Sequence, residues 1–414
     1  MTSFPDGFLW GVATAGHQNE GGNDRSDIWF LEGVVPSLFR ERSGDACRAY
    51  DLYESDLDLV AGLGLNAFRF SVEWARIEPE RGVISEEALD HYEAVVDAAI
   101  ARGLAPLVTF NHFASPHWFS AAGSWLADDA PELFAAQVSR VMTRFGDRIA
   151  AAVTINEPNL EQLLQAGGKL PAEAEVVKRE MLAAAARAAG TERYFASNVI
   201  PAEAQADFQE ALTRAHRAAK AAAKAQRPDL PVGVSIAIVD DVALPGGEAN
   251  RDARRAAVYD HWLDVARDDD FIGIQNYERF VFDADGEVAP TGELNGMGSA
   301  VEPCALAGAA RYAHERSGVP VLVTEHGMQT DDDEQRAAFI PRALAALAEE
   351  IAAGTPVIGY CHWTLMDNFE WIFGYGPKLG LVEVDRETFE RTPKPSAEVY
   401  AAVVQEARSV VAAA

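Results

Sequence analysis

Cysteine is scarce in this chain of 414 residues. The three cysteines, Cys47, Cys304 and Cys361, are widely spaced, odd in number and include no Cys-x-x-Cys pair. Such a set provides neither a disulfide framework nor a zinc motif, and it is typical of proteins from a reducing compartment. We therefore expect a cytoplasmic protein with no disulfide scaffold.

Membrane-directing segments and basic residues are also lacking. The amino terminus has no basic stretch followed by an apolar one, and no run of about 18 apolar residues occurs that would span a bilayer. Only 35 Lys and Arg stand against 64 Asp and Glu, which gives a formal net charge of −29. Because such a surface repels phosphate groups, we expect neither nucleic acid nor a membrane as a partner. Charge leaves the oligomeric state open.

The chain does contain a globular composition and a repeating pattern of short apolar runs. Apolar residues make up 49% and charged residues 24% of the sequence. The runs are rich in Val, Ile and Phe and nearly continuous, as is typical of strands that are buried on both faces. We expect strands at residues 8–14, 66–72, 105–110, 152–156, 232–239, 271–276, 319–325 and 356–363.

Helical patterns lie between these runs. Residues 86–103 have apolar side chains at helical spacing and end in Gly103, and the Ala-rich segment 158–226 predicts long helices after the fourth strand. The Asp runs at 268–270 and 331–333 indicate solvated loops or helix caps rather than metal ligands. Eight strand–helix repeats predict an α/β fold, a single (β/α)8 TIM barrel over residues 1–414, rather than a doubly wound sheet.

Polar residues concentrate where the expected strands end. In a barrel of this kind the carboxyl ends of the strands carry the active site, so these residues predict a polar cavity for a polar ligand. They are Gln18, Arg69, Glu73, His112, Asn156, Glu157, Gln275, Asn276, Tyr277, Thr324, Glu325, His326 and Trp363.

Glu157 and Glu325 end the fourth and seventh strands, so we expect their carboxyl groups to face each other across the mouth of the barrel. Glycosidic cleavage needs such a pair, one group to protonate the leaving oxygen and one to stabilise the oxocarbenium-like carbon. A single Glu after a strand is more often a cap or a surface ion pair, so the assignment depends on the flanking sequence.

Six segments of the chain resemble glycoside hydrolase family 1, the β-glucosidase and β-galactosidase family, in the family's order and nearly from end to end. Each pentapeptide alone is a weak signal, but the ordered set is specific. The segments are FPDGFLWGVATAGHQNEG (4–21), LGLNAFRFSVEWARIEPERG (63–82), GLAPLVTFNHFASPHWF (103–119), TINEP (154–158), VTEHG (323–327) and GYCHWTLMDNFEWIFGYGPKLGLVEVDRETFERTPKPS (359–396).

The resemblance implies a retaining β-glycosidase that hydrolyses terminal β-D-glucosides, with β-galactosides and β-fucosides as further substrates. Glu325 would be the nucleophile and Glu157 the acid/base, and no cofactor is implied. The Glu157 pKa should be raised while Glu325 stays ionised. The family holds the nucleophile at the positions of Arg69 and Tyr277. The implied sugar-binding residues are Gln18, His112, Asn156, Gln275, Trp363, Glu370 and Trp371.

Glu370 also bears on the kind of sugar. The branch of the family that hydrolyses phosphorylated sugars replaces this carboxylate, because it would repel a 6-phosphate. The presence of Glu370 therefore favours an unphosphorylated small-molecule carbohydrate as substrate.

The chain departs from the family at several positions. His326 replaces the usual Asn after the nucleophile, and Gln275 replaces an Asn, so we expect both changes to lie near the sugar. Asn159, Ser299 and Leu379 replace aromatic residues on the leaving-group side, where their loss should widen that subsite.

Two other functions fit parts of the pattern. A non-catalytic sugar-binding barrel would explain the substitutions around the site, although both carboxylates are present. A metal-dependent hydrolase would need clustered ligands at strand ends, where only His112 and His326 come near.

Overall fold

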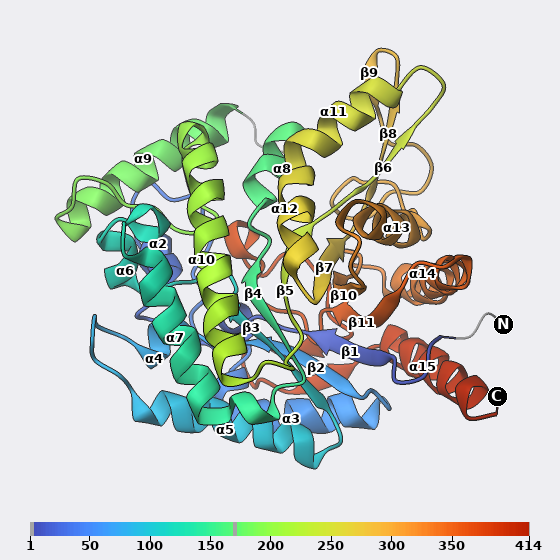
Figure 1. Ribbon diagram of the computed structural model, residues 1–414, viewed down its shortest axis with the longest axis horizontal. Helices are drawn as coiled ribbons and strands as arrows, with labels where there is room; N and C mark the ends of the chain where they lie inside the picture. Colours follow the sequence, from blue (N-terminus) through green and yellow to red (C-terminus); the bar gives the residue numbers. More distant parts are fainter. Residues whose placement is uncertain (1–3, 169–171, 414) are drawn as a thin grey trace.

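The computed structural model describes residues 4–168 and 172–413. Eight parallel strands form a closed barrel with helices outside it (Figure 1). Every strand expected from the apolar runs is a barrel strand, so the prediction of a (β/α)8 barrel is confirmed. Around the barrel the strands are β1 (Leu9–Ala13), β2 (Ala67–Ser71), β3 (Ala105–Asn111), β4 (Ala151–Asn156), β5 (Val232–Ala237), β7 (Phe271–Asn276), β10 (Val321–His326) and β11 (Val357–Trp363).

At least one long helix follows each barrel strand and returns the chain to the start of the next. Neighbouring helices also pack against one another, as α7 and α10 do where they lie side by side in Figure 1. The long helices are α3 (Ala49–Gly62), α5 (Glu86–Ala101), α7 (Ala130–Phe145), α10 (Gln205–Gln226), α11 (Glu248–Val258), α13 (Ala305–Ser317), α14 (Asp333–Ala353) and α15 (Pro395–Ala413).

Shorter helices, 3₁₀ turns and minor strands lie in the loops between the barrel strands and the long helices. The short helices are α1 (Gly16–Asn19), α2 (Asp27–Glu32), α4 (Trp74–Ile77), α6 (His117–Ala121), α8 (Leu160–Ala166) and α12 (Asp260–Val265). A further long helix, α9 (Ala172–Ala189), precedes α10 in the excursion after β4. Single 3₁₀ turns are η1 (Ser124–Leu126), η2 (Gly146–Arg148), η3 (Ala202–Ala204), η4 (Ala266–Asp268) and η5 (Trp371–Phe373). Two minor sheets consist of β6 (Asp240–Ala243), β8 (Arg279–Asp283) and β9 (Gly286–Val288), and of β12 (Val382–Val384) and β13 (Arg391–Pro393).

Alternation along the strands separates the core from the site. In β2, Phe68 and Phe70 belong to the core between barrel and helices, whereas Arg69, between them, points into the barrel and is fully buried. Small and apolar side chains such as Ala67 and Leu107 form a second cluster of buried residues that also includes Trp363. Apolar packing therefore supports polar side chains at the carboxyl ends of the strands.

The expected helices are present, with one correction. Gly103 follows α5 with a φ of 74°, as a helix-terminating glycine should, and α8, α9 and α10 form the predicted excursion after β4. Asp332 caps α14 by accepting a hydrogen bond from the Glu334 amide at 3.0 Å. The prediction of a solvated Asp run at 268–270 is wrong for Asp269, which is buried and paired with Lys220 at 2.8 Å.

Among the described residues, no helix has both the length and the apolar character required to span a bilayer.

Close strand packing generates a stability prediction at Gly233. A Cβ at this position of β5 would overlap the carbonyl oxygen of Phe271 in the neighbouring strand β7, and a strand backbone cannot move away as a flexible side chain can. We expect Gly233→Ala to lower the free energy of unfolding by about 1–3 kcal/mol or more, as overpacking does. Urea unfolding followed by circular dichroism measures the loss.

Gly62→Ala is the matched control, because a Cβ at the end of α3 meets nothing within 4 Å. Its stability should equal or slightly exceed that of the wild type. Equal unfolding midpoints for the two variants would contradict the packing argument.

Candidate active site

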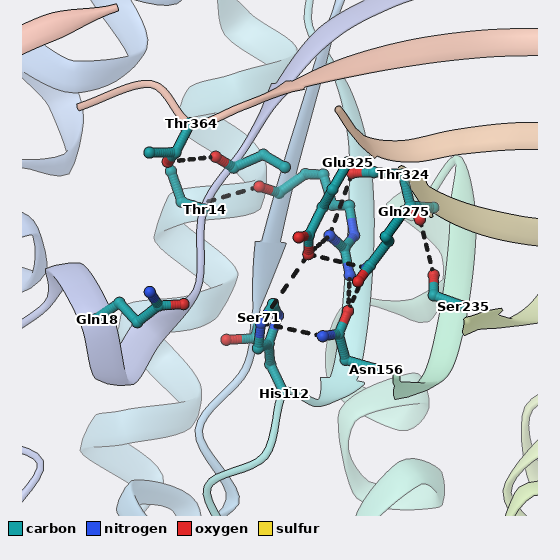
Figure 2. A network of polar contacts seen from close by, with 12 residues as sticks. Thr14, Gln18, Ser71, His112, Asn156, Ser235, Gln275, Thr324, Glu325 and Thr364 are labelled. Carbon is teal, nitrogen blue, oxygen red and sulfur yellow. Dashed lines mark hydrogen bonds and ion pairs between the residues drawn. The ribbon is translucent and has the colours of Figure 1, made fainter. Parts of the chain in front are cut away.

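The mouth of the barrel gathers polar side chains from strands that are far apart in sequence. Arg69 comes from β2, Asn156 from β4, Gln275 from β7 and Glu325 from β10, and all four are buried. Figure 2 shows the labelled side chains of Asn156, Gln275 and Glu325 converging, joined by dashed lines. Because the strands are parallel, their carboxyl ends meet at one face of the barrel.

Three donors hold the Glu325 carboxylate. The Arg69 guanidinium donates from Nη1 to Oε1 at 2.6 Å, and the Gln275 amide donates to the same oxygen at 2.9 Å. The Tyr277 hydroxyl donates to Oε2 at 2.7 Å. Both oxygens are therefore fixed, and the carboxylate is oriented before any ligand enters. Arg69 and Tyr277, the two residues that the resemblance implies as supports, both donate to Glu325.

Asn156 ties this cluster to His112. Its Oδ1 accepts from Arg69 Nη2 and from Gln275 Nε2, both at 2.6 Å, while its Nδ2 faces His112 Nε2 at 3.2 Å. The amide nitrogen of Gln275, which the resemblance implies as a sugar-binding residue, contacts Glu325 and Asn156, while its Oε1 has no hydrogen-bond partner among the described residues. Its longer side chain, compared with Asn, provides the reach for both contacts.

Glu157 directly follows β4 and has a strained backbone. Its φ of 43° lies in the left-handed region that non-glycine residues rarely adopt. Its amide donates to the Ser235 carbonyl of β5 at 2.8 Å, which pins the residue at the strand end. Within the described residues, no hydrogen bond reaches the Glu157 carboxyl group, so this group is far less constrained than that of Glu325.

Burial and mutual repulsion separate the two carboxyl groups. Burial, and next the negative charge of Glu325, raise the pKa of Glu157 well above its usual value. Burial also raises the pKa of Glu325, but Arg69 and then the Tyr277 hydroxyl oppose the rise. The prediction that the Glu157 pKa is raised agrees with these shifts, whereas the pKa of Glu325 also lies above its ordinary value.

A second polar group forms where Gln18 of α1 meets Glu370 on the loop after β11. Gln18 Nε2 donates to Glu370 Oε2 at 3.2 Å and to the Phe369 carbonyl at 2.9 Å. Burial, and next the charge of Glu325, raise the pKa of Glu370 to about 8. The Gln18 Oε1 atom is buried and has no partner in the described part of the chain, so it offers an acceptor to a polar ligand.

Aromatic rings form the walls of the site. The His112 ring stacks on Trp363 at 5.8 Å between centroids and lies nearly parallel to Trp371 at 6.2 Å. Trp363 is only 3% exposed. Flat apolar faces beside amide and carboxyl groups suit a ring with C–H faces and hydroxyl edges.

His326 lies outside this site, which corrects the expectation that it is near the sugar. Adjacent strand residues face opposite sides of a sheet, so Glu325 points inward and His326 points toward the helices. The His326 ring stacks on Phe339 of α14 at 5.2 Å, and its Nδ1 lies 2.9 Å from the Tyr360 hydroxyl. Burial lowers the His326 pKa to about 3. His112 and His326 therefore do not form a ligand pair.

No group of three or more His, Cys, Asp or Glu side chains suited to a metal ion occurs among the described residues.

Two contacts at the site carry no signal in the sequence pattern. His17 stacks on Trp371 at 5.7 Å, and Glu32 contacts His17 at 2.9 Å from helix α2. His17 precedes Gln18 in the first segment of family resemblance, but nothing in its spacing indicates an aromatic partner 354 positions later in the chain.

Comparison with known proteins defines the class. The chain is 30% identical over 445 residues to the thermostable β-glucosidase B of Thermobispora bispora, covering 97% of this chain and 91% of that protein. The crystal structure of β-glycosidase BGL167 is 47% identical, with a TM-score of 0.91 and coverage of 98% of this chain and 97% of the other. Together with the barrel, these relatives define an O-glycosyl hydrolase of the β-glycosidase type.

A match to a family profile shows which family the chain belongs to. Residues 1–263 and 283–409 match the glycosyl hydrolase family 1 profile. This chain belongs to glycosyl hydrolase family 1. Another member, the bifunctional β-D-glucosidase/β-D-fucosidase of Bifidobacterium breve, is 30% identical over 450 residues, covering 96% of this chain and 97% of that protein.

The buried ion pair generates a stability prediction. Arg69→Met leaves the Glu325 carboxylate without its cation, so we expect a loss of about 3–5 kcal/mol in the free energy of unfolding at neutral pH. Without Arg69, the folded-state pKa of Glu325 rises further above its unfolded value. The loss should therefore grow as pH increases from about 5 to about 8. Urea unfolding at both pH values measures it.

The double variant Arg69→Met/Glu325→Gln is the control, since it removes the charge that Arg69 compensates. Its stability loss should not grow with pH. A single variant that loses the same free energy at both pH values would contradict the role of the ion pair.

Proposed function

We propose that this chain is a single catalytic domain, residues 1–414, that hydrolyses terminal non-reducing β-D-glucosides with retention of configuration. The main support for this proposal is the contrast between two carboxyl groups at the mouth of the barrel, those of Glu325 and Glu157. Three donors orient Glu325, whereas the Glu157 side chain has a strongly raised pKa and no hydrogen bond among the described residues. This contrast suits a fixed nucleophile and a proton-carrying acid.

In the first displacement, a Glu325 oxygen forms a bond to the anomeric carbon as the glycosidic bond breaks. Glu157 donates its proton to the departing oxygen, so the leaving group departs as a neutral alcohol. Arg69 and Tyr277 keep the nucleophilic carboxylate ionised and aimed. The product of this step is a covalent glycosyl-enzyme and an ionised Glu157.

In the second displacement, Glu157 acts as a base. It removes a proton from water, whose oxygen attacks the anomeric carbon and releases Glu325. Loss of the covalent bond restores the charge on Glu325, which in turn raises the pKa of Glu157 again. Two inversions at one carbon give net retention.

The remaining polar residues suit recognition of the terminal sugar. Glu370 presents a carboxyl group, and Gln18 presents an amide oxygen that has no partner among the described residues. Asn156 and His112 lie beside the proposed nucleophile. Trp363 supplies the apolar floor, and Trp371 a neighbouring wall. The relative from Bifidobacterium breve is named for both glucosidase and fucosidase activity, which supports β-fucosides as a second substrate class.

The nucleophile assignment predicts a specific rescue. Glu325→Ala should lower hydrolysis of an aryl β-glucoside by at least about four orders of magnitude, because no covalent intermediate forms. Added azide should restore turnover by entering the space left by the carboxylate and give the α-glycosyl azide. Release of the aryl group and NMR of the product measure both effects.

Glu203→Ala is the matched control, because Glu203 pairs with Arg179 on the exposed surface. It should hydrolyse the substrate at the wild-type rate. Full activity of Glu325→Ala would end the assignment, and a wild-type protein that binds glucosides without cleaving them would favour a sugar-binding barrel.

The acid assignment predicts a pH effect. Because Glu157 must carry a proton, kcat/KM should fall as pH rises through its raised pKa. Glu157→Gln cannot lose that proton, so its alkaline limb should be absent. Its kcat/KM, which reports the first displacement, should drop steeply for a poor leaving group and little for 2,4-dinitrophenolate, which departs without protonation. Its kcat should fall with both substrates, because Glu157 is also the base of the second displacement. Profiles of kcat/KM against pH with both substrates measure this, and an unchanged alkaline limb would contradict it.

A further inference from the structure

Two consecutive residues of α1 contact two consecutive residues of the loop after β11. Gln18 donates to the Glu370 carboxyl group, and His17 stacks on the Trp371 indole. The proposed function uses Gln18, Glu370 and Trp371, but it leaves His17 without a role. His17 is 1% exposed and lies behind the wall of the site, so it does not touch a bound sugar.

The rings of His17 and Trp371 are nearly parallel. The ring centroids lie 5.7 Å apart and the ring planes differ by only 7°. Phe113 contacts the same indole edge-on at 5.1 Å. The Trp371 backbone has a φ of 48°, in the left-handed region, and belongs to a single 3₁₀ turn. A backbone in this region persists only where the surrounding structure holds it, and the rings of His17 and Phe113 are among the contacts that hold the indole.

The His17 ring is itself fixed on both edges. Its Nε2 lies 2.9 Å from Glu32 Oε1, and the other Glu32 oxygen accepts from the Ser43 amide and hydroxyl, both at 3.0 Å. On the opposite edge, the Asn23 amide nitrogen and the Ser26 hydroxyl lie 3.3 and 3.4 Å from Nδ1. The contacts on both edges give the ring one orientation, with Nε2 toward Glu32 and Nδ1 toward Asn23 and Ser26.

We infer that His17, held by Glu32, is a positioning residue that orients Trp371 and thereby sets which terminal sugar the site prefers. The inference rests on the proposed function, because it is there that Trp371 borders the sugar. α1 then acts as a template for the Glu370–Trp371 pair: Gln18 places the carboxyl group and His17 places the indole.

Two substitutions of His17 distinguish the effect of its aromatic ring from that of its hydrogen bond to Glu32. His17→Gln keeps a donor for Glu32 but removes the aromatic face, whereas His17→Phe keeps the face and removes the donor. We expect His17→Gln to raise KM for an aryl β-glucoside about three- to tenfold, the scale of one aromatic contact. Its kcat should change less, and its kcat/KM ratio between β-glucoside and β-fucoside should shift. His17→Phe should keep that ratio within about twofold of the wild type.

His91→Gln and His91→Phe are matched controls. His91 also stacks on an aromatic ring, Tyr50 at 3.6 Å, but it lies on the outer helix α5. Neither control should change KM or the sugar ratio. If His17→Gln lowers only the melting temperature or the fraction of active enzyme, with KM and the ratio unchanged, His17 is structural and the inference is overturned. Equal effects of Gln and Phe at position 17 would also overturn it, because the ring would then be irrelevant.

Binding of deoxynojirimycin, measured by calorimetry, separates this inference from the proposed function. The affinity of the inhibitor should be lower for His17→Gln than for the wild type and unchanged for His91→Gln. This comparison needs no turnover. If the wild type cleaves no glycoside, the proposed function is refuted. If the inhibitor nevertheless binds more weakly to His17→Gln than to the wild type, the role of His17 is supported. Equal affinities of the two proteins would refute that role.

Discussion

The ion pair between Arg69 and Glu325 is the interaction on which the rest of the site depends. Both side chains are almost completely buried, at 0% and 5% exposure, in the centre of the barrel. Charges in such a place are stable only with short contacts and further hydrogen bonds. Arg69 uses its two terminal nitrogens for Glu325 and Asn156, and Asn156 in turn faces His112. One guanidinium therefore contacts side chains from two other strands, β10 and β4, and Asn156 extends the network to His112, just after β3.

The ion pair also explains why the two carboxyl groups differ. Glu325 receives donors and a cation, so the rise that burial imposes on its pKa is opposed. Glu157 has a cation only at longer range and the negative charge of Glu325 nearby, so its pKa rises well above the usual value. Two residues of one type thus acquire different proton affinities from their surroundings alone, although burial raises the pKa of both. The barrel supplies this difference because β2, β4 and β10 end at one face.

Much of the fold could be predicted from the sequence, because strands buried on both faces leave a clear signature. Each of the eight apolar runs is a barrel strand, and Gly103 marks the end of its helix. The gathering of Arg69, Asn156, Glu157 and Glu325 followed from the same topology. Their chemical roles remain proposals. Local sequence says little about where a long side chain ends, as Gln275 illustrates by contacting Glu325 and Asn156.

Other features could not be predicted, for identifiable reasons. Asp269 looks like part of a solvated acidic run, but Lys220, 49 positions earlier, covers it. The stack of His17 on Trp371 joins the two ends of the chain, and no periodicity encodes a contact of that kind. Such contacts depend on tertiary structure alone.

The outward position of His326 has a consequence for how the protein can change. Glu325 and His326 are neighbours in the chain, but the first side chain belongs to the polar cluster inside the barrel and the second packs between the barrel and α14. A substitution at position 326 therefore changes the packing against α14, whereas one at position 325 changes the buried contact with Arg69. Evolution, or a protein engineer, can reach helix packing and the polar cluster through two neighbouring positions of a single strand.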